Sequence, residues 1–335
     1  MKPAIFAIAG LVLTDDERAF FRDAEPAGYI LFGRNIGDAD QVRALTDELR
    51  ALHARDDVAI LVDQEGGRVA RLAQPEWPAF PPGEAFDRLY AKAPASAIEA
   101  ARFNALALGS VLSDLGITVD CLPLLDVRRA GAHDVIGDRA LGSEPMQVAA
   151  LGRATLDGLR EGGVVGVVKH MPGHGRAGVD SHKALPVVTA SDEELADDLA
   201  PFSALRDAPM AMTAHVVYTA WDADRCATLS PRVIDEIIRG RIGFEGLLMS
   251  DDIDMEALDG TIPDRSRAAL AAGCDVVLNC WARMDDMVGI ANAIDDISPL
   301  SSARLDAAMA RISGKRDPRP YAELAAQRDT LLAIA

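Results

Sequence analysis

The residues best suited to chemistry in this chain stand close together in one stretch, VVGVVKHMPGHGRAGVDSHKALP, which covers residues 164–186. Lys169 and His170 follow an apolar β-branched run that is typical of a buried strand. A glycine-rich loop comes next and delivers Asp180 and His182 two positions apart. Because the loop is long for a simple connection, this stretch has the layout of an active site.

Asp180 and His182 have the types and spacing needed for proton transfer. An aspartate that accepts a hydrogen bond from one imidazole nitrogen fixes the tautomer and raises the pKa of the histidine. The other nitrogen can then donate a proton to a leaving group, which contributes about 10²–10⁴ in rate. The alternative is a turn in which Asp180 bonds the backbone and His182 has no role, and the pair taken alone favours that alternative.

Asp251 and Asp252 close a second apolar strand, Gly246–Met249. A carboxylate at such a strand end is partly shielded from water, and it can act as a nucleophile or base if nearby cations keep it ionised. The alternative for each aspartate is to cap the helix that follows. Because the two are adjacent, one can cap while the other reacts.

Three histidines, His170, His174 and His182, allow a rival interpretation in which a barrel-type hydrolase binds zinc. Their spacing matches no compact metal motif, and Lys169 beside His170 would repel a cation. The sequence therefore predicts no metal and no cofactor.

A further set of charged residues suits a small neutral polyol. Sugars are bound through several hydrogen-bond donors and acceptors rather than through one dominant charge. The alternative use of the same residues is in ion pairs on a rim, and both uses can hold at once. The predicted sugar contacts are Asp63, Arg71, Arg139, Lys169 and His170.

These residues need a scaffold that brings strand ends together, and the chain alternates short apolar runs with polar loops and amphipathic helices. The expected strands are Ile5–Ile8, Tyr29–Phe32, Ala59–Val62, Ile117–Cys121, Val164–Val168, Met210–Thr213, Leu247–Met249 and Val276–Leu278. The expected helices include Asp38–His53, Ala95–Leu112, Pro145–Arg160 and Ser191–Leu205. Helix-end signals are capping boxes at Thr14–Glu17 and Ser191–Glu194, an N-cap at Ser230 and a C′ glycine at Gly240.

Eight strand–helix units predict an α/β fold, specifically a (β/α)₈ TIM-type barrel. A doubly wound sheet is the alternative, weakened because no glycine-rich dinucleotide fingerprint follows an early strand. In a barrel the carboxyl ends of all strands form one rim, and polar residues follow six of the expected strands. We expect one catalytic domain over residues 1–335, with the helices of residues 301–335 packing on the outside.

Composition limits the partners. Apolar residues make up 49% of the 335, and 52 acidic against 34 basic residues give a formal charge of −18, which argues against binding nucleic acid. Four widely spaced cysteines indicate reduced thiols and a cytoplasmic protein. Residues 4–13 begin like a signal peptide, but the apolar part is short and runs directly into acidic residues, so we favour a first strand and expect no membrane contact.

The chain resembles glycoside hydrolase family 3, and within it the bacterial single-domain β-N-acetylglucosaminidases of peptidoglycan recycling. The most specific part of the resemblance is Lys-His-x-Pro-Gly-His-Gly with a downstream Asp-Ser-His, within residues 169–186. The resemblance covers nearly the whole chain, and its other segments are GYILFGRN at 28–35, VDQEGGRV at 62–69, IGDR at 136–139 and MSDD at 249–252.

This resemblance implies that Asp251 is the catalytic nucleophile, His182 the general acid/base and Asp180 the carboxylate that polarises it. The five predicted sugar contacts match those of the family. Met171 stands where phenylalanine is usual and Arg176–Ala177 where Asp–Thr is common, so loop packing and aglycone preference are the properties these departures affect.

The activity implied is that of a retaining exo-β-N-acetylglucosaminidase that removes terminal non-reducing β-linked GlcNAc from peptidoglycan-derived muropeptides through a covalent glycosyl-enzyme. The alternatives are a β-N-acetylglucosaminide phosphorylase of the same family, a metal-dependent barrel hydrolase and a non-catalytic sugar-binding barrel. We expect a small-molecule sugar as the partner, and a monomer or weak homo-oligomer.

Overall fold

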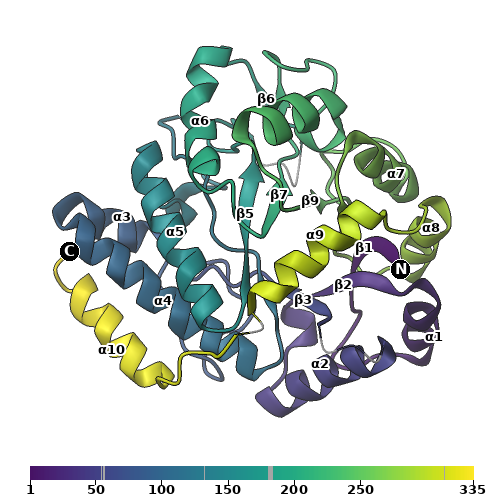
Figure 1. The fold of residues 1–335 in the computed structure, drawn as a ribbon, viewed down its shortest axis with the longest axis horizontal. Helices are drawn as coiled ribbons and strands as arrows, with labels where there is room; N and C mark the ends of the chain where they lie inside the picture. Colours follow the sequence, from purple (N-terminus) through teal and green to yellow (C-terminus); the bar gives the residue numbers. More distant parts are fainter. Residues whose placement is uncertain (54, 56, 132, 180–183, 313) are drawn as a thin grey trace.

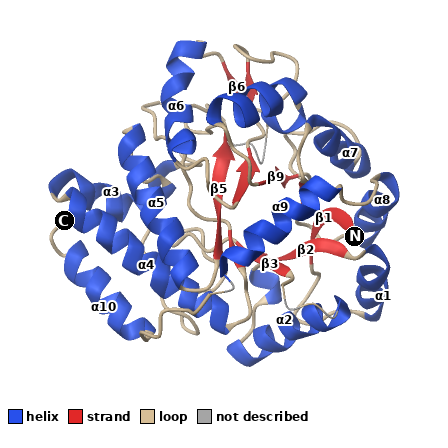
Figure 2. Cartoon of the chain, in the orientation of Figure 1, coloured by secondary structure: helices blue, strands red, loops and turns tan. Residues whose placement is uncertain are grey.

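The computed structural model describes residues 1–335 apart from 54, 56, 132, 180–183 and 313. Eight parallel strands form a closed barrel in the order β1-β10-β9-β7-β5-β4-β3-β2 (Figure 2). They are β1 (Lys2–Ala7), β2 (Pro26–Leu31), β3 (Ala59–Val62), β4 (Val119–Asp120), β5 (Val165–Met171), β7 (Met210–Thr213), β9 (Leu247–Asp252) and β10 (Val276–Asn279). The predicted (β/α)₈ barrel is confirmed, and closure of the sheet excludes the doubly wound alternative.

Two strands run further than their apolar residues predict. β5 continues to Met171 and β9 to Asp252, each three residues past the expected end. β5 is buried along its whole length, so Lys169 and His170 lie inside the strand rather than beyond it. The prediction that Lys169 and His170 follow the buried strand is wrong, because acidic partners meet both side chains within it.

Helices surround the barrel in a ring (Figure 1). They are α1 (Asp15–Ala24), α2 (Ala39–His53), α3 (Gly83–Lys92), α4 (Pro94–Asp114), α5 (Pro145–Glu161), α6 (Asp192–Ala204), η4 (Val233–Ile242), α7 (Ile262–Ala272), α8 (Met284–Ala293), α9 (Pro299–Met309) and α10 (Tyr321–Leu332), with short 3₁₀ turns at Gly33–Asn35, Gly137–Arg139, Ala227–Leu229 and Ala310–Ile312. The long predicted helices are present with ends that shift by a few residues.

The predicted helix-end signals are partly confirmed. The side chains of Thr14 and Ser191 each accept a hydrogen bond from the backbone three residues on, in complete capping boxes. Ser230 Oγ accepts from the backbone N–H of Val233, at 3.1 Å. Gly240 as a C′ residue is wrong, because the helix continues past it to Ile242, and Gly243 takes the left-handed conformation with φ 74°.

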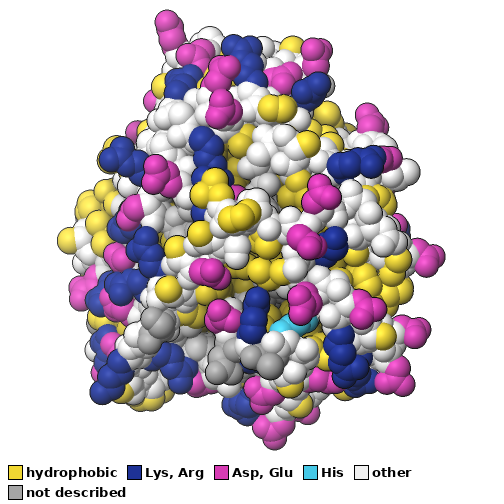
Figure 3. All heavy atoms as spheres, turned by 45° about the vertical axis from the view of Figure 1, so that its right-hand side comes forward, with side chains coloured by type: hydrophobic (Ala, Val, Ile, Leu, Met, Phe, Trp, Pro, Cys, Tyr) yellow, Lys and Arg dark blue, Asp and Glu magenta, His cyan; other side chains and the backbone are white. Residues whose placement is uncertain are grey.

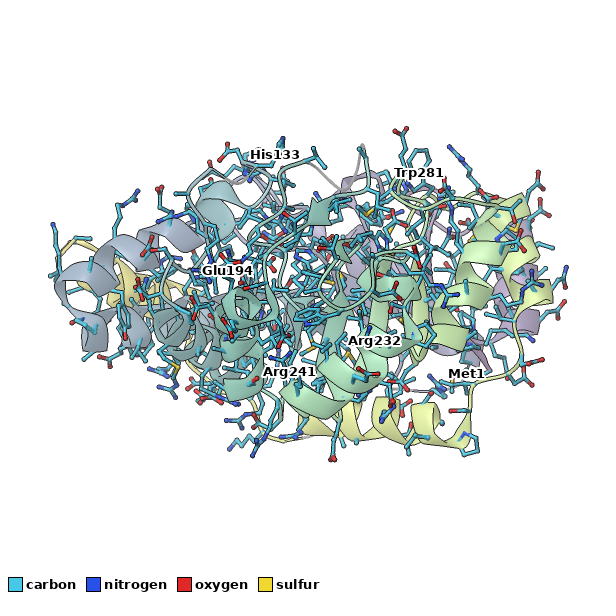
Figure 4. All side chains as sticks on the ribbon, turned by 90° about the horizontal axis from the view of Figure 1, so that it is seen from above. Met1, His133, Glu194, Arg232, Arg241 and Trp281 are labelled. Atoms are coloured by element: carbon cyan, nitrogen blue, oxygen red, sulfur yellow. The ribbon has the colours of Figure 1, made fainter. Side chains whose placement is uncertain are left out.

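The last two helices lie at different places on the barrel. α10 packs against α4 and α3 on the outer face. α9 crosses one end of the barrel, where Leu305, Ala308 and Met309 join the apolar core inside the strands. Figure 4 shows α9 along one edge of the molecule and His133 and Trp281 at the opposite edge. The end opposite α9 is therefore the one at which the strands finish and their loops gather.

A small parallel sheet braces the long loop after β5. β6 (Val187–Val188) pairs with β8 (Val217–Tyr218), beyond the carboxyl-terminal side of the loop. On the amino-terminal side, the Tyr218 hydroxyl donates to the carbonyl oxygen of Gly173 at 2.7 Å. Tyr218 and its strand therefore hold both ends of the stretch that carries the predicted acid/base pair.

Within the described residues no helix combines the length and apolar character that crossing a lipid bilayer requires. All four cysteines are buried and unpaired, as predicted. The face drawn in Figure 3 carries intermixed acidic and basic side chains, without a continuous basic stripe.

The close approach of the loop after β5 to the segment after β4 gives a stability prediction. A Cβ at Gly175 would lie 1.9 Å from the carbonyl oxygen of Val127, whereas a Cβ at Gly178 would meet no atom of the described residues within 4 Å. We expect Gly175→Ala to lower the free energy of unfolding by about 1–3 kcal/mol, because the backbone must move apart. Gly178→Ala is the matched control, expected within about 0.5 kcal/mol of the wild type. Urea denaturation measures both, and equal losses in the two variants would contradict the prediction.

Candidate active site

A cavity of about 360 Å³ opens at the carboxyl ends of the barrel strands, a size typical of small-molecule sites. Asp251 and all five predicted sugar contacts line it, whereas Asp180 and His182 lie outside the described residues. Among the residues that the structure describes, the lining is Phe32, Asp63, Glu65, Arg68, Val69, Arg71, Val135, Ile136, Arg139, Lys169, His170, His174, Met212, Asp251, Asp252, Leu278 and Cys280.

A buried cluster of opposite charges forms one wall. Lys169 Nζ lies 3.0 Å from Asp63 Oδ1 and 2.7 Å from Glu65 Oε1. Arg139 grips Glu65 with two parallel hydrogen bonds, Nε to Oε2 at 2.8 Å and Nη2 to Oε1 at 2.7 Å. Arg71 Nη2 contacts Asp63 Oδ2 at 3.3 Å. The Lys169 and Glu65 side chains are only 2% and 4% exposed, so this cluster is assembled in a largely dry environment.

Electrostatics keeps every member of this cluster charged. Burial alone would raise the pKa of both carboxyls, but Lys169 together with Arg71 at Asp63 and with Arg139 at Glu65 outweighs it and lowers the pKa of both below the usual range. Burial would conversely lower the pKa of Lys169 and Arg139, and the carboxylates instead raise both. The wall thus offers fixed donors and acceptors with nearly balanced charge, which suits a neutral polyol.

His170 is oriented from beneath by Asp126, which is fully buried. Asp126 Oδ2 contacts His170 Nδ1 at 2.7 Å, and its Oδ1 accepts from the backbone N–H groups of His170 at 3.2 Å and His174 at 2.6 Å. Although burial opposes it, His170 lowers the pKa of Asp126, so the carboxylate is ionised and Nδ1 carries the hydrogen. Burial lowers the pKa of His174 to about 4, which keeps that ring neutral.

The two adjacent aspartates of β9 have different environments. Asp251 accepts at Oδ1 from the backbone N–H of Asp252, at 2.8 Å. Asp252 Oδ1 accepts from the backbone N–H groups of Asp254 at 3.0 Å and Cys280 at 3.3 Å. Burial, together with the negative charge of Asp254, raises the pKa of Asp252 well above its usual range. Asp252 is therefore tied to backbone N–H groups and favours its protonated form, so the two adjacent aspartates are not equivalent.

Two carboxylates of the site, Glu65 and Asp126, were not singled out by the sequence analysis. Glu65 lies two positions after Asp63, and Asp126 follows the short strand β4. An acidic residue just after an apolar strand is the signal that could have found both, because neither can be buried there without a cation or a hydrogen-bond donor. The sequence alone did not say which partner each would meet.

Two of the three histidines of the metal hypothesis, His170 and His174, lie side by side with ring centroids 5.7 Å apart. The third, His182, lies outside the described residues. In the part of the chain that the structure describes, no three His, Cys, Asp or Glu side chains are grouped to hold a metal ion.

A parallel barrel with a balanced hydrogen-bonding wall and a carboxylate at its carboxyl-terminal mouth is the framework of a barrel enzyme for a small polar substrate. Residues 8–314 match the family model described as the glycosyl hydrolase family 3 N terminal domain. The chain therefore belongs to glycosyl hydrolase family 3.

Individual relatives agree with this assignment. The chain is 38% identical to the beta-hexosaminidase of Aromatoleum aromaticum, over 92% of this chain and 87% of that one. It is also 38% identical to the beta-hexosaminidase of Chromobacterium violaceum, over 99% and 92% of the two chains. The crystal structure of NagZ from Neisseria gonorrhoeae in complex with N-trifluoroacetyl-D-glucosamine has a TM-score of 0.86 at 32% identity, covering 100% of this chain and 98% of that chain.

The buried charge cluster predicts a strong effect of removing one carboxylate. Glu65→Gln leaves Lys169 and Arg139 short of negative charge in a dry site, so we expect a loss of about 3–5 kcal/mol in the free energy of unfolding at pH 7. Because folding lowers the pKa of Glu65, its contribution is present above about pH 4.3 and is lost as the pH falls below that value. The difference from the wild type should therefore narrow below about pH 4.3.

Urea denaturation across this pH range makes the measurement. The control is Glu76→Gln, which removes the same charge from an exposed residue and should change stability by less than about 0.5 kcal/mol. Similar losses in the two variants, or a difference that widens in acid, would count against the charge cluster.

Proposed function

We propose that the protein is a retaining exo-β-N-acetylglucosaminidase that removes terminal non-reducing β-linked GlcNAc from peptidoglycan-derived muropeptides in the cytoplasm. The observation that carries the proposal is that Asp251 lines the same pocket as the balanced charge cluster of Asp63, Lys169 and Arg139. The relatives' name, beta-hexosaminidase, and the N-acetylglucosamine analogue in the Neisseria gonorrhoeae structure support the sugar.

Sugar recognition falls to the charged wall. Asp63, Lys169 and Arg139 keep fixed geometry because Lys169 pairs with Asp63 and Glu65 pairs with both Lys169 and Arg139, so they can offer hydrogen bonds to sugar hydroxyls without reorganising. Arg71 and His170 extend this set along the pocket. A neutral sugar fits such a wall better than an anion does, because the carboxylates already balance the buried cations.

The reaction is a double displacement. Asp251 attacks the anomeric carbon while His182, oriented by Asp180, protonates the departing oxygen, and the bond between the sugar and the aglycone breaks. A glycosyl-enzyme ester forms on Asp251. His182 then takes a proton from water, the water attacks the anomeric carbon, and the sugar leaves with the configuration retained.

The first experiment compares hydrolysis of an aryl β-N-acetylglucosaminide with that of the matching aryl β-glucoside, in chelator-treated and phosphate-free buffer. We expect selective turnover of the acetamido sugar, and no turnover by Asp251→Ala with either substrate, because no nucleophile remains. Activity that requires added phosphate would indicate a phosphorylase, and activity that requires zinc would indicate a metal-dependent hydrolase. If the wild type hydrolyses neither substrate under any condition, the remaining hypothesis is a sugar-binding protein, and Asp251 has no role as a nucleophile.

The role of His182 predicts a dependence on the leaving group. His182→Ala should lose about 10²–10⁴ in kcat/KM on substrates whose leaving group needs a proton, because the general acid is gone. On an activated aryl glycoside the loss should be much smaller. The measurement is kcat/KM of the wild type and of His182→Ala on a series of aryl β-N-acetylglucosaminides whose leaving groups rise in pKa. Equal losses in kcat/KM along the series would show that His182 is not the general acid.

A further inference from the structure

A buried histidine outside the charged wall touches the backbone of the segment that presents Asp251. His215 is completely buried beyond the end of β7. Its Nε2 lies 2.9 Å from the carbonyl oxygen of Asp252, and its Nδ1 lies 2.7 Å from Thr228 Oγ1. Thr228 Oγ1 is in turn 2.8 Å from Thr213 Oγ1, which accepts from the backbone N–H of Asp251 at 3.3 Å.

The partners fix the direction of every hydrogen bond in this group. The carbonyl oxygen of Asp252 can only accept, so His215 Nε2 carries a hydrogen. Burial lowers the pKa of His215, and the neutral ring then leaves Nδ1 as an acceptor. The Thr228 hydroxyl is the donor at hand for Nδ1, at 2.7 Å, while the carbonyl of Ala214 is a more distant alternative acceptor for it at 3.1 Å. Donation to Ala214 instead would leave Nδ1 buried with no donor from Thr228.

Once Thr228 donates to the ring, its oxygen receives the hydroxyl hydrogen of Thr213. The Thr213 oxygen is then left to accept from the N–H of Asp251. The hydrogen bonds therefore run in one direction, from the Asp251 N–H through two hydroxyls and one imidazole to the carbonyl of Asp252. We call these three side chains the Thr–Thr–His network: Thr213, Thr228 and His215.

We propose that the Thr–Thr–His network positions the carboxylate of Asp251 for attack, by fixing the peptide segment 251–252 at both ends. This inference rests on the proposed role of Asp251 as nucleophile. The network binds the N–H of Asp251 at one end of this segment and the carbonyl oxygen of Asp252 at the other. Between them, the N–H of Asp252 donates to Asp251 Oδ1 and so orients that carboxylate. All three network side chains are fully buried and none lines the pocket, so they act as positioning residues rather than as contacts of the substrate.

Thr228 offers a sharp test, because valine and serine separate its hydroxyl from its shape. Thr228→Val keeps the volume but removes both the donor to His215 and the acceptor for Thr213, whereas Thr228→Ser keeps the hydroxyl. We expect Thr228→Val to lower kcat on an aryl β-N-acetylglucosaminide by about 10- to 100-fold, since a displaced nucleophile attacks poorly. KM and the calorimetric Kd for free N-acetylglucosamine should stay within about twofold, because other strands supply the sugar contacts. Thr228→Ser should recover most of kcat.

Two results would overturn the proposal: equal kcat in the valine and serine variants, or a loss in Thr228→Val that appears as weakened N-acetylglucosamine binding. Should Thr228→Val not fold, as judged by near-ultraviolet circular dichroism, Thr213→Val and Thr213→Ser make the same comparison at the neighbouring link. In the double variant Thr213→Val/Thr228→Val we expect no further fall in kcat, because one break already opens the network, and additive losses would contradict it.

Asp251→Ala, measured beside these variants, separates the two hypotheses. Activity retained by Asp251→Ala would remove the proposed function itself. If Asp251→Ala is inactive but Thr228→Val and Thr228→Ser have the same kcat, the proposed function stands. Only the positioning role of the network is then contradicted.

Discussion

The site depends first on one constraint, the burial of the Lys169 ammonium inside the barrel. An ammonium moved out of water costs several kcal/mol unless carboxylates meet it with good geometry. Asp63 and Glu65, which follow β3 and so lie two strands along the barrel from β5, supply those carboxylates. Both carboxylate oxygens of Glu65 also accept hydrogen bonds from Arg139. This arginine comes from a loop more than seventy positions away in the sequence. One buried charge therefore requires three separate segments to close in a single arrangement.

The opposite wall of the pocket follows a different physical rule. Among the described residues, hydroxyls of two threonines and one imidazole hydrogen-bond the backbone of Asp251 and Asp252, and they are ordered by the direction of their hydrogen bonds. Ion pairs suit the recognition wall because they hold donors and acceptors rigidly without net charge. In the function proposed above, sugar binding and bond-making would therefore be supported by separate groups of side chains.

The sequence predicted the barrel and most strand positions, because apolar periodicity depends on local residues alone. It also predicted that polar residues after β3, β5 and β9 would gather, since parallel strands finish at one rim. What it missed are pairings between distant segments. The extension of β5 through Lys169 depends on Asp63 and Glu65, and no local pattern contains that information. The family motifs identify candidate site residues but not the side chains that contact them. The roles of Asp126 and Glu65 could therefore be seen only in the folded structure.

The adjacent aspartates show how the fold turns equal residues into unequal ones. Asp252 lies beside Asp254, and two buried carboxyls so close cannot both ionise easily, so Asp252 retains a proton. Asp254 Oδ2 accepts from Asn279 Nδ2 at 2.8 Å and from the backbone N–H of Cys280 at 2.9 Å. A protonated Asp252 places no negative charge next to Asp251. The acidic pair that looks redundant in the sequence is therefore divided by the fold, with Asp252 tied to backbone N–H groups and Asp251 lining the pocket.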